Sequence, residues 1–315
     1  MCGIAGIIKN NTITQIDKKK LSFMLKAIKH RGPDSTGFAL YCERDNKESK
    51  QYIMRMKVAE SHETIKSYDI QAKIEERIKS VQSRLSELGV EVMGVEKITE
   101  YALRYTLNCD DNLRQLANYI EDVEGVEILS IGKGLELVKD LGDATVVSNL
   151  YSLKSFSGTH AIGHTRMATE SDVDIRSAHP YWAYPFADVS VVHNGQLTNY
   201  WSKRRELERK GHRFMSSCDS ELIAVYIADK IEQGRNLEDS MLQSVDELDG
   251  VFTYLLATSD SLGMAKDTMA AKPMVLFESD NIVALASEEV AIRTIMNNEI
   301  DTSDPYDGEV RVWQA

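Results

Sequence analysis

Cysteines, basic residues and long apolar runs are all scarce in this sequence, and each shortage excludes a class of protein. The 315 residues include only four cysteines, none in C-x-x-C spacing, which argues against a zinc site and against a disulfide framework. The 37 basic residues are outnumbered by 49 acidic ones, and a net charge of −12 argues against a nucleic-acid partner. No apolar run approaches the ~18 residues of a membrane span, and Lys9 and Asn10 interrupt the first short one, so no signal peptide is visible. We therefore expect a cytoplasmic protein that contacts neither nucleic acid nor membrane.

The most informative residue present is Cys2, because an apolar, strand-like segment follows it directly. Removal of Met1 is expected before such a small residue, and it would leave a thiol and a free α-amino group on the same residue. The thiolate is the nucleophilic form of cysteine, and an α-amine with a pKa of about 8 is a suitable general base. Cys2 is thus a candidate catalytic nucleophile that needs no separate histidine. The alternative is an ordinary buried cysteine that packs as a small apolar side chain.

The order of elements along the chain predicts an α+β fold. Strands follow one another as hairpins and helices are grouped between them, which favours antiparallel sheets packed under helices over a parallel βαβ sheet. The apolar periodicity predicts strands at residues 2–8, 38–42, 51–56, 160–163, 188–192, 251–258, 262–266, 274–278 and 282–286. It predicts helices at residues 16–29, 199–209, 220–232, 237–248 and 288–296.

The middle of the chain differs from the rest in its composition. Residues 57–156 are rich in charge and predict a small α+β module, inserted between the two parts of the main domain at 1–56 and 157–315. Helices are expected at 70–88 and 111–120, and strands at 91–98, 101–107 and 126–131. Nothing in this insertion points to catalysis. A solvated helper module, a docking surface for a partner and a small-molecule sensor remain open.

Three short polar segments lie at the ends of expected elements. Arg166 follows one strand, where its guanidinium fork suits a carboxylate and Thr169 could add a hydroxyl. Asn194 and Gly195 end another strand, where an amide and a backbone N–H can supply two donors to an oxyanion. Asp219 opens a helix, where its carboxylate could receive an ammonium group.

Each segment also has a plainer interpretation. Arg166 would form a surface ion pair, Asn194 and Gly195 a simple turn, and Asp219 a helix N-cap. Taken together with Cys2, however, the segments outline a pocket for a free amino acid whose side-chain amide the thiol attacks.

Several histidines and aromatic residues also invite functional interpretations. We interpret His30, His164, His179 and His193 as structural hydrogen-bonding residues, since an N-terminal nucleophile needs neither a histidine base nor a metal. Tyr181, Trp182 and Tyr184 fall in an expected loop that would either close over a bound substrate or pack statically.

At this level of detail the sequence resembles the class II glutamine amidotransferases, which are N-terminal nucleophile hydrolases. The resemblance is carried by Cys2-Gly3-Ile4, His30-Arg31-Gly32-Pro33-Asp34, Gly163-His164-Thr165-Arg166, His193-Asn194-Gly195, Cys218-Asp219-Ser220-Glu221 and Asp249-Gly250-Val251-Phe252. It implies a four-layer α/β/β/α sandwich of antiparallel sheets, and a glutaminase whose Cys2 forms a γ-glutamyl thioester. No cofactor and no metal are implied.

The same resemblance implies roles for individual residues. Arg166 and Asp219 match the family's glutamine anchors, and Asn194 with Gly195 matches its oxyanion hole. Arg31 matches an arginine close to the nucleophile, and we group it and Thr169 with the substrate-binding residues.

The family's amidophosphoribosyltransferases, hexosephosphate aminotransferases and asparagine synthetases continue into a synthase domain, which we do not expect in this chain. Residues 158–171 and 178–180 look most similar to the stand-alone amidotransferase subunit of split, archaeal-type glutamate synthases and of N-methylglutamate synthase assemblies. This implies L-glutamine as substrate and a separate flavin-dependent synthase subunit as partner. Two alternatives remain open: an N-terminal nucleophile amidase for another γ-glutamyl or acyl amide, and a non-catalytic regulatory subunit that retains Met1. Whether the chain forms a homo- or hetero-oligomer also stays open.

Overall fold

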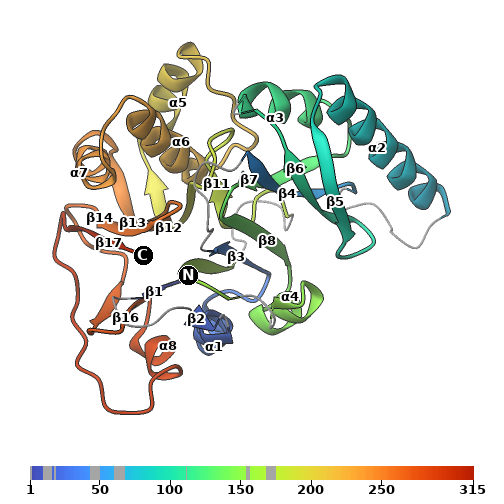
Figure 1. Ribbon diagram of the computed structural model, residues 1–315. Coiled ribbons are helices and arrows are strands. Elements are labelled where there is room, and N and C mark those ends of the chain that lie inside the picture. Colours follow the sequence, from blue (N-terminus) through green and yellow to red (C-terminus); the bar gives the residue numbers. More distant parts are fainter. Residues whose placement is uncertain are drawn as a thin grey trace.

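The computed structural model describes residues 2–9, 16–17, 19–42, 50–59, 68–110, 112–153, 157–167 and 175–315 (Figure 1). Two antiparallel sheets lie at its centre. The first has the strand order β15 (Val275–Glu278), β16 (Ile282–Ala286), β1 (Gly3–Lys9), β10 (His160–Arg166), β3 (Ser35–Tyr41) and β8 (Leu135–Leu141). The second has the order β11 (Tyr181–Trp182), β12 (Ser190–Leu197), β13 (Gly250–Ala257), β14 (Ser261–Lys266) and β17 (Val310–Gln314).

Helices cover the outer face of each sheet, as Figure 1 shows. Over the six-stranded sheet lie α1 (Lys19–Ala27), α4 (Ala144–Leu150) and α8 (Glu289–Arg293). Over the five-stranded sheet lie α5 (Tyr200–Arg209), α6 (Asp219–Glu232) and α7 (Leu237–Glu247). The predicted α+β sandwich of four layers with antiparallel sheets is therefore confirmed.

Side chains that alternate between the two faces of each strand explain why each sheet packs between two apolar cores. In β1, Ile4 and Ile8 belong to the apolar core that lies between the sheets, whereas Ala5 and Ile7 pack against α1 and its neighbours. Successive strand residues point to opposite faces of a sheet, so a strand buried on both faces reads as continuously apolar. The start of β1 is thereby fixed in the middle of the molecule, where its first residue can meet both sheets.

A third sheet stands beside the sandwich. Its strand order is β5 (Glu91–Lys97), β6 (Ala102–Asn108), β4 (Gln51–Lys57) and β7 (Glu127–Gly132), with α2 (Tyr68–Glu87) and α3 (Leu113–Glu121) as its helices. This is the β-α-β-β-α-β order of a split βαβ unit. In this pairing β4 belongs to the third sheet and β8 to the six-stranded one. The division of the chain at residues 57 and 156 stays a prediction.

Three short elements complete the described part of the chain: β2 (Ile16–Asp17), which pairs with β9 (Ser157–Gly158), and the 3₁₀ helix η1 (Lys29–Arg31). Within the described residues, no helix combines the length and the apolar character required to cross a bilayer.

Candidate active site

Cys2 lies where three segments of the chain converge. Antiparallel pairing of Gly3 with Thr165 brings the start of β1 beside the end of β10. The backbone N–H of Met167, just past β10, donates to Cys2 Sγ at 3.4 Å. The carbonyl oxygen of Cys2 accepts two further hydrogen bonds, from Arg31 Nε at 2.9 Å and from Asn194 Nδ2 at 3.0 Å. The backbone and the sulfur of this residue are therefore both held in place.

Arg31 reaches Cys2 from the end of η1. Its Nη1 also donates to Glu288 Oε1 at 2.6 Å, and His30 Nε2 lies 3.2 Å from the same carboxylate. Burial works to raise the pKa of Glu288, but the hydrogen bonds from Arg31 and His30 outweigh it and hold this pKa below its usual range. Glu288 thus keeps the negative charge that orients the guanidinium of Arg31.

Gly32 allows η1 to pass this closely. A Cβ at Gly32 would collide with the backbone of Arg166 and Met167. The next turn is fixed in the same place, since the Asp34 N–H donates to the Arg166 carbonyl oxygen at 3.1 Å. Close packing of η1 against the end of β10 is what brings Arg31 to Cys2.

Asn194 and Gly195 lie in β12, in the second sheet. Asn194 Nδ2 lies 3.5 Å from Ser287 Oγ, and that hydroxyl oxygen accepts from the Ile4 N–H at 2.9 Å. Asn194 Oδ1 is buried and has no hydrogen-bond partner among the described residues. Gly195 has a φ of +144°, and a Cβ there would strike Val251 and Phe252 of the neighbouring strand. Only glycine fits at this position.

Asp219 is the first residue of α6. Its Oδ2 accepts a hydrogen bond from the Leu197 N–H at 2.9 Å, and its Oδ1 lies 3.7 Å from His193 Nδ1. The next residue, Ser220, is buried, and its hydroxyl oxygen lies 2.8 Å from His193 Nδ1 and 3.2 Å from His179 Nε2. A serine thus connects the start of α6 to β12 and to the segment before β11.

The buried imidazoles behind Asp219 are neutral at physiological pH. Burial lowers the pKa of His164 to about 3, and it also lowers the pKa of His179 and of His193, where the Asp219 carboxylate acts in the opposite direction. The rings of His164 and His179 stack with centroids 4.0 Å apart. No set of three or more His, Cys, Asp or Glu side chains is arranged to hold a metal ion anywhere in the described ranges.

The structure brings most of the predicted site residues together. Cys2, Arg31 and Asn194 are joined through the Cys2 carbonyl, and Arg166 immediately precedes the Met167 N–H that contacts the sulfur. Asp219 is tied to Leu197, two residues after Gly195. Thr169 lies outside the described residues. The assigned roles in catalysis and substrate binding stay predictions.

Residues with direct contacts to this group that were not among the predicted site residues include Met167, Ser220, Ser287 and Glu288. Met167 contacts Cys2 through its backbone N–H, so its side-chain type gives no indication of the contact. Ser287 and Glu288 directly follow the end of strand β16. The predicted polar segments also lie at the ends of elements, so this position could have identified the two residues from the sequence. Their partners Ile4 and Arg31 lie 283 and 257 positions away in sequence.

The segment from Tyr181 to Tyr184, expected as a loop, contains strand β11. Tyr181, Trp182 and Tyr184 are all buried, and Tyr184 Oη donates to Asn118 Oδ1 of α3 at 2.8 Å. Of the two interpretations of this segment, the observed packing corresponds to the static one.

Comparison with known proteins identifies the family. A profile described as a glutamine amidotransferase domain matches residues 164–294. A putative glutamine amidotransferase of Methanothermobacter thermautotrophicus is 38% identical over 317 residues, covering 100% of both chains. The glutamine amidotransferase-like protein GlxB of Rhizobium meliloti is 32% identical over 315 residues, covering 100% of this chain and 95% of its own.

The fold is found again in a solved structure. Glutamine phosphoribosylpyrophosphate amidotransferase from B. subtilis superposes with a TM-score of 0.59 at 18% identity, over 99% of this chain and 47% of that one. At this identity the likeness concerns the fold alone. With relatives matching from end to end and the N-terminal nucleophile hydrolase fold in place, the chain belongs to the class II glutamine amidotransferases and is an enzyme of that type.

Proposed function

We propose that this chain is a glutaminase subunit that uses Cys2 as its nucleophile. After removal of Met1, the Cys2 sulfur attacks the side-chain amide carbon of L-glutamine while the α-amine takes the thiol proton and passes it to the leaving nitrogen. The C–N bond breaks and ammonia leaves a γ-glutamyl thioester. Water then cleaves the C–S bond, releasing glutamate and restoring the thiol.

The observation that carries this proposal is the convergence of Arg31, Asn194 and the Met167 N–H on Cys2. A residue used only as packing would not need its carbonyl and its sulfur both held by donors from separate segments. Asn194 and Gly195 would stabilise the oxyanion. A carboxamide has two N–H donors: one holds the Cys2 carbonyl, and the other, which reaches Ser287 Oγ only over 3.5 Å, can donate to the substrate instead. Arg166 would bind the α-carboxylate of glutamine, Asp219 its α-ammonium group, and Thr169 would add a hydroxyl.

The proposal extends to a partner. Residues 158–171 and 178–180 resemble the stand-alone amidotransferase subunit of split glutamate synthases, in which a separate chain carries the flavin. Hydrolysis of glutamine serves an organism mainly when the ammonia is used. We therefore assign the ammonia to a separate flavin-dependent subunit of glutamate-synthase type, with both proteins in the cytoplasm.

The test combines mass and activity. Intact-mass measurement should show a chain that begins at Cys2, and 6-diazo-5-oxo-L-norleucine should label that residue. Cys2→Ala should abolish labelling and glutamine hydrolysis, whereas Cys109→Ala, in the third sheet's module, should leave both unchanged. Retention of glutamine hydrolysis by Cys2→Ala, alone or in the assembled complex, would falsify the proposal.

A further inference from the structure

Residues 215–218 lead directly into Asp219 and form neither helix nor strand. Cys218 is the N-cap of α6, but its side chain makes no capping hydrogen bond. A Ser, Thr, Asp or Asn side chain usually supplies that bond and so fixes the first turn of a helix. The position of the first turn of α6, and of Asp219 within it, therefore depends on other contacts.

Glu221 supplies such contacts from inside the first turn of α6. Its Oε1 accepts a hydrogen bond from the Met215 N–H at 2.7 Å. Its Oε2 accepts from the Ser216 N–H at 2.7 Å and from the Ser216 hydroxyl at 2.6 Å. The Ser216 hydroxyl oxygen in turn accepts from the Cys218 N–H at 3.1 Å. A carboxylate that is 2% exposed thus ties residues 215–218 to the helix that they precede.

Arg204 holds the same residues from α5, which packs beside α6 (Figure 1). Its Nη1 donates to the Ser216 carbonyl oxygen at 2.7 Å, and its Nε donates to Glu208 Oε1 at 2.9 Å. The guanidinium also lies over the ring of Phe214, 4.8 Å from the ring centroid. The N–H, the carbonyl and the hydroxyl of Ser216 are therefore all hydrogen-bonded, which leaves residues 215–218 little freedom to move.

The position of Asp219 is set by two kinds of contact. Its Oδ2 accepts from the Leu197 N–H at 2.9 Å, which relates the carboxylate to β12. Glu221 relates the backbone of the first turn to residues 215–218. A shift of that turn would move the carboxylate relative to Gly195 and β12, and a misplacement of about 1 Å in a binding group can cost as much as 100-fold in rate.

We propose that Glu221 is a positioning residue that sets the place of Asp219 for the α-ammonium group of glutamine. The inference rests on the proposed function, which assigns this ammonium group to Asp219. Both carboxylate oxygens of Glu221 already accept hydrogen bonds from Met215 or Ser216, so Glu221 acts through Asp219 and not on the substrate. Its effect is therefore confined to substrates that carry the ammonium group.

A comparison of two substrates tests this restriction. Glutaramate is glutamine without its α-amino group, so it keeps the carboxylate and the amide but offers no ammonium group to Asp219. Glu221→Gln keeps the size of the side chain but turns one acceptor into a donor, and we expect it to raise KM for glutamine about tenfold with a smaller change in kcat. The kcat/KM for glutaramate should stay within about twofold of wild type. Glu232→Gln, exposed at the other end of α6, is the matched control and should change neither.

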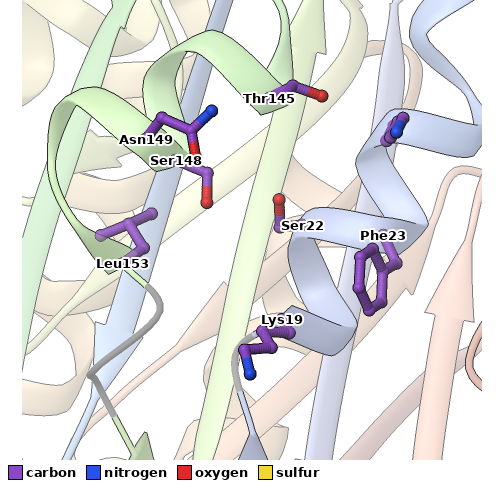
Figure 2. A pocket seen from close by; sticks show the side chains of 8 residues that line it. Lys19, Ser22, Phe23, Thr145, Ser148, Asn149 and Leu153 are labelled. Atoms are coloured by element: carbon purple, nitrogen blue, oxygen red, sulfur yellow. The ribbon is translucent and has the colours of Figure 1, made fainter.

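Ser216→Ala is a milder variant that removes only the hydroxyl between Glu221 and the Cys218 N–H. It should raise KM for glutamine about threefold and leave glutaramate hydrolysis unchanged. Its control is Ser22→Ala in the opposite helical layer, where Figure 2 shows the Ser22 side chain beside the open groove between α1 and α4. A glutaramate rate that falls together with the glutamine rate in either variant, or a glutamine KM unchanged in both, would overturn the proposal.

Hydrogen exchange separates this inference from the proposed function, because it requires no activity. The Met215 and Ser216 amides should exchange about threefold faster or more in Glu221→Gln than in wild type, and at the wild-type rate in Glu232→Gln. Equal exchange in Glu221→Gln and wild type would show that Glu221 does not hold these residues, and would overturn the proposal whatever the kinetics. Absence of glutamine hydrolysis by the wild-type chain would instead defeat the proposed function, and the exchange rates would still decide whether Glu221 holds the start of α6.

Discussion

The side-chain amide nitrogen of Asn194 donates a hydrogen bond to the backbone carbonyl oxygen of Cys2 over 3.0 Å. Asn194 belongs to the five-stranded sheet and Cys2 immediately precedes a strand of the six-stranded sheet, so this bond joins the two halves of the sandwich. Arg31 donates to the same oxygen from the 3₁₀ helix. The position of the nucleophile thus depends in part on a contact that forms only when both sheets are stacked.

Replacing the amide of Asn194 tests its role as an oxyanion donor. Asn194→Asp keeps the shape of the side chain but removes both N–H donors, and we expect kcat to fall by about 100- to 1000-fold with a small change in KM. Steady-state glutaminase kinetics measure this. Asn298→Asp is the matched control, because Asn298 is exposed. A fall confined to KM would show that Asn194 binds glutamine in its ground state instead.

The contact between Arg31 and Glu288 should be energetically coupled. Arg31 is buried and bridges the Cys2 carbonyl and the Glu288 carboxylate, a task that a lysine cannot reproduce with one ammonium group. We expect Arg31→Lys to lower kcat/KM about tenfold. A double-mutant cycle with Glu288→Gln should give a coupling of about 1–2 kcal/mol in urea unfolding.

The neighbouring pair Arg293 and Glu289 provides the control for that cycle. Both side chains are exposed on α8, and exposed ion pairs of this kind contribute little to stability. No measurable coupling is expected there. An equally small coupling for Arg31 and Glu288 would mean that their contact does not fix the position of Cys2.

Ser220 should act as a positioning residue for Asp219. Its hydroxyl joins His193 to His179 directly beside the carboxylate, and its removal would leave two buried imidazole nitrogens without a partner. We expect Ser220→Ala to raise KM for glutamine about tenfold with a smaller effect on kcat, and Ser220→Thr to restore part of the loss. A lower melting temperature with KM unchanged would assign the network to folding alone.

The residue pattern is sufficient to predict antiparallel sheets packed under helices, and the family resemblance adds the four layers and the candidate site residues. Strands such as β1 and β13 are apolar over most of their length. The motif residues Cys2, Asn194 and Asp219 lie at or near the ends of elements that the periodicity predicts. The apolar pattern also locates α6 and α7 to within a residue at each end. These features are local, so a single sequence is sufficient to find them.

Strand β8 and helix α4 were not predicted, and buried charges explain the failure at β8. Its sequence includes Glu136, Lys139 and Asp140, which break the apolar pattern although all three are buried. Glu136 is accommodated because Arg55 and Arg104 both donate to it. Such compensation joins segments far apart in sequence. The same holds for the link between Arg31 and Glu288, which local sequence patterns cannot reveal.

Glu121, at the end of α3, should make the protein less stable as the pH rises. Burial raises the pKa of this carboxyl from 4.5 to about 7, although the Ile128 N–H donates to it. The folded chain therefore binds a proton that the unfolded chain releases between pH 4.5 and 7. The stability from this group is fully present below pH 4.5 and is lost as the pH rises through 7, a difference of about 3 kcal/mol.

Glu121→Gln keeps the acceptor for Ile128 and removes the titration. We expect the free energy of unfolding of this variant, relative to wild type, to increase by about 3 kcal/mol between pH 4.5 and 8 in urea titrations. The buried histidines are present in both proteins, so their contribution cancels in the comparison. Glu124→Gln, exposed in the same module, should show no such trend. A constant difference between Glu121→Gln and wild type across this range would mean that Glu121 is ionised in the folded protein as it is in the unfolded chain.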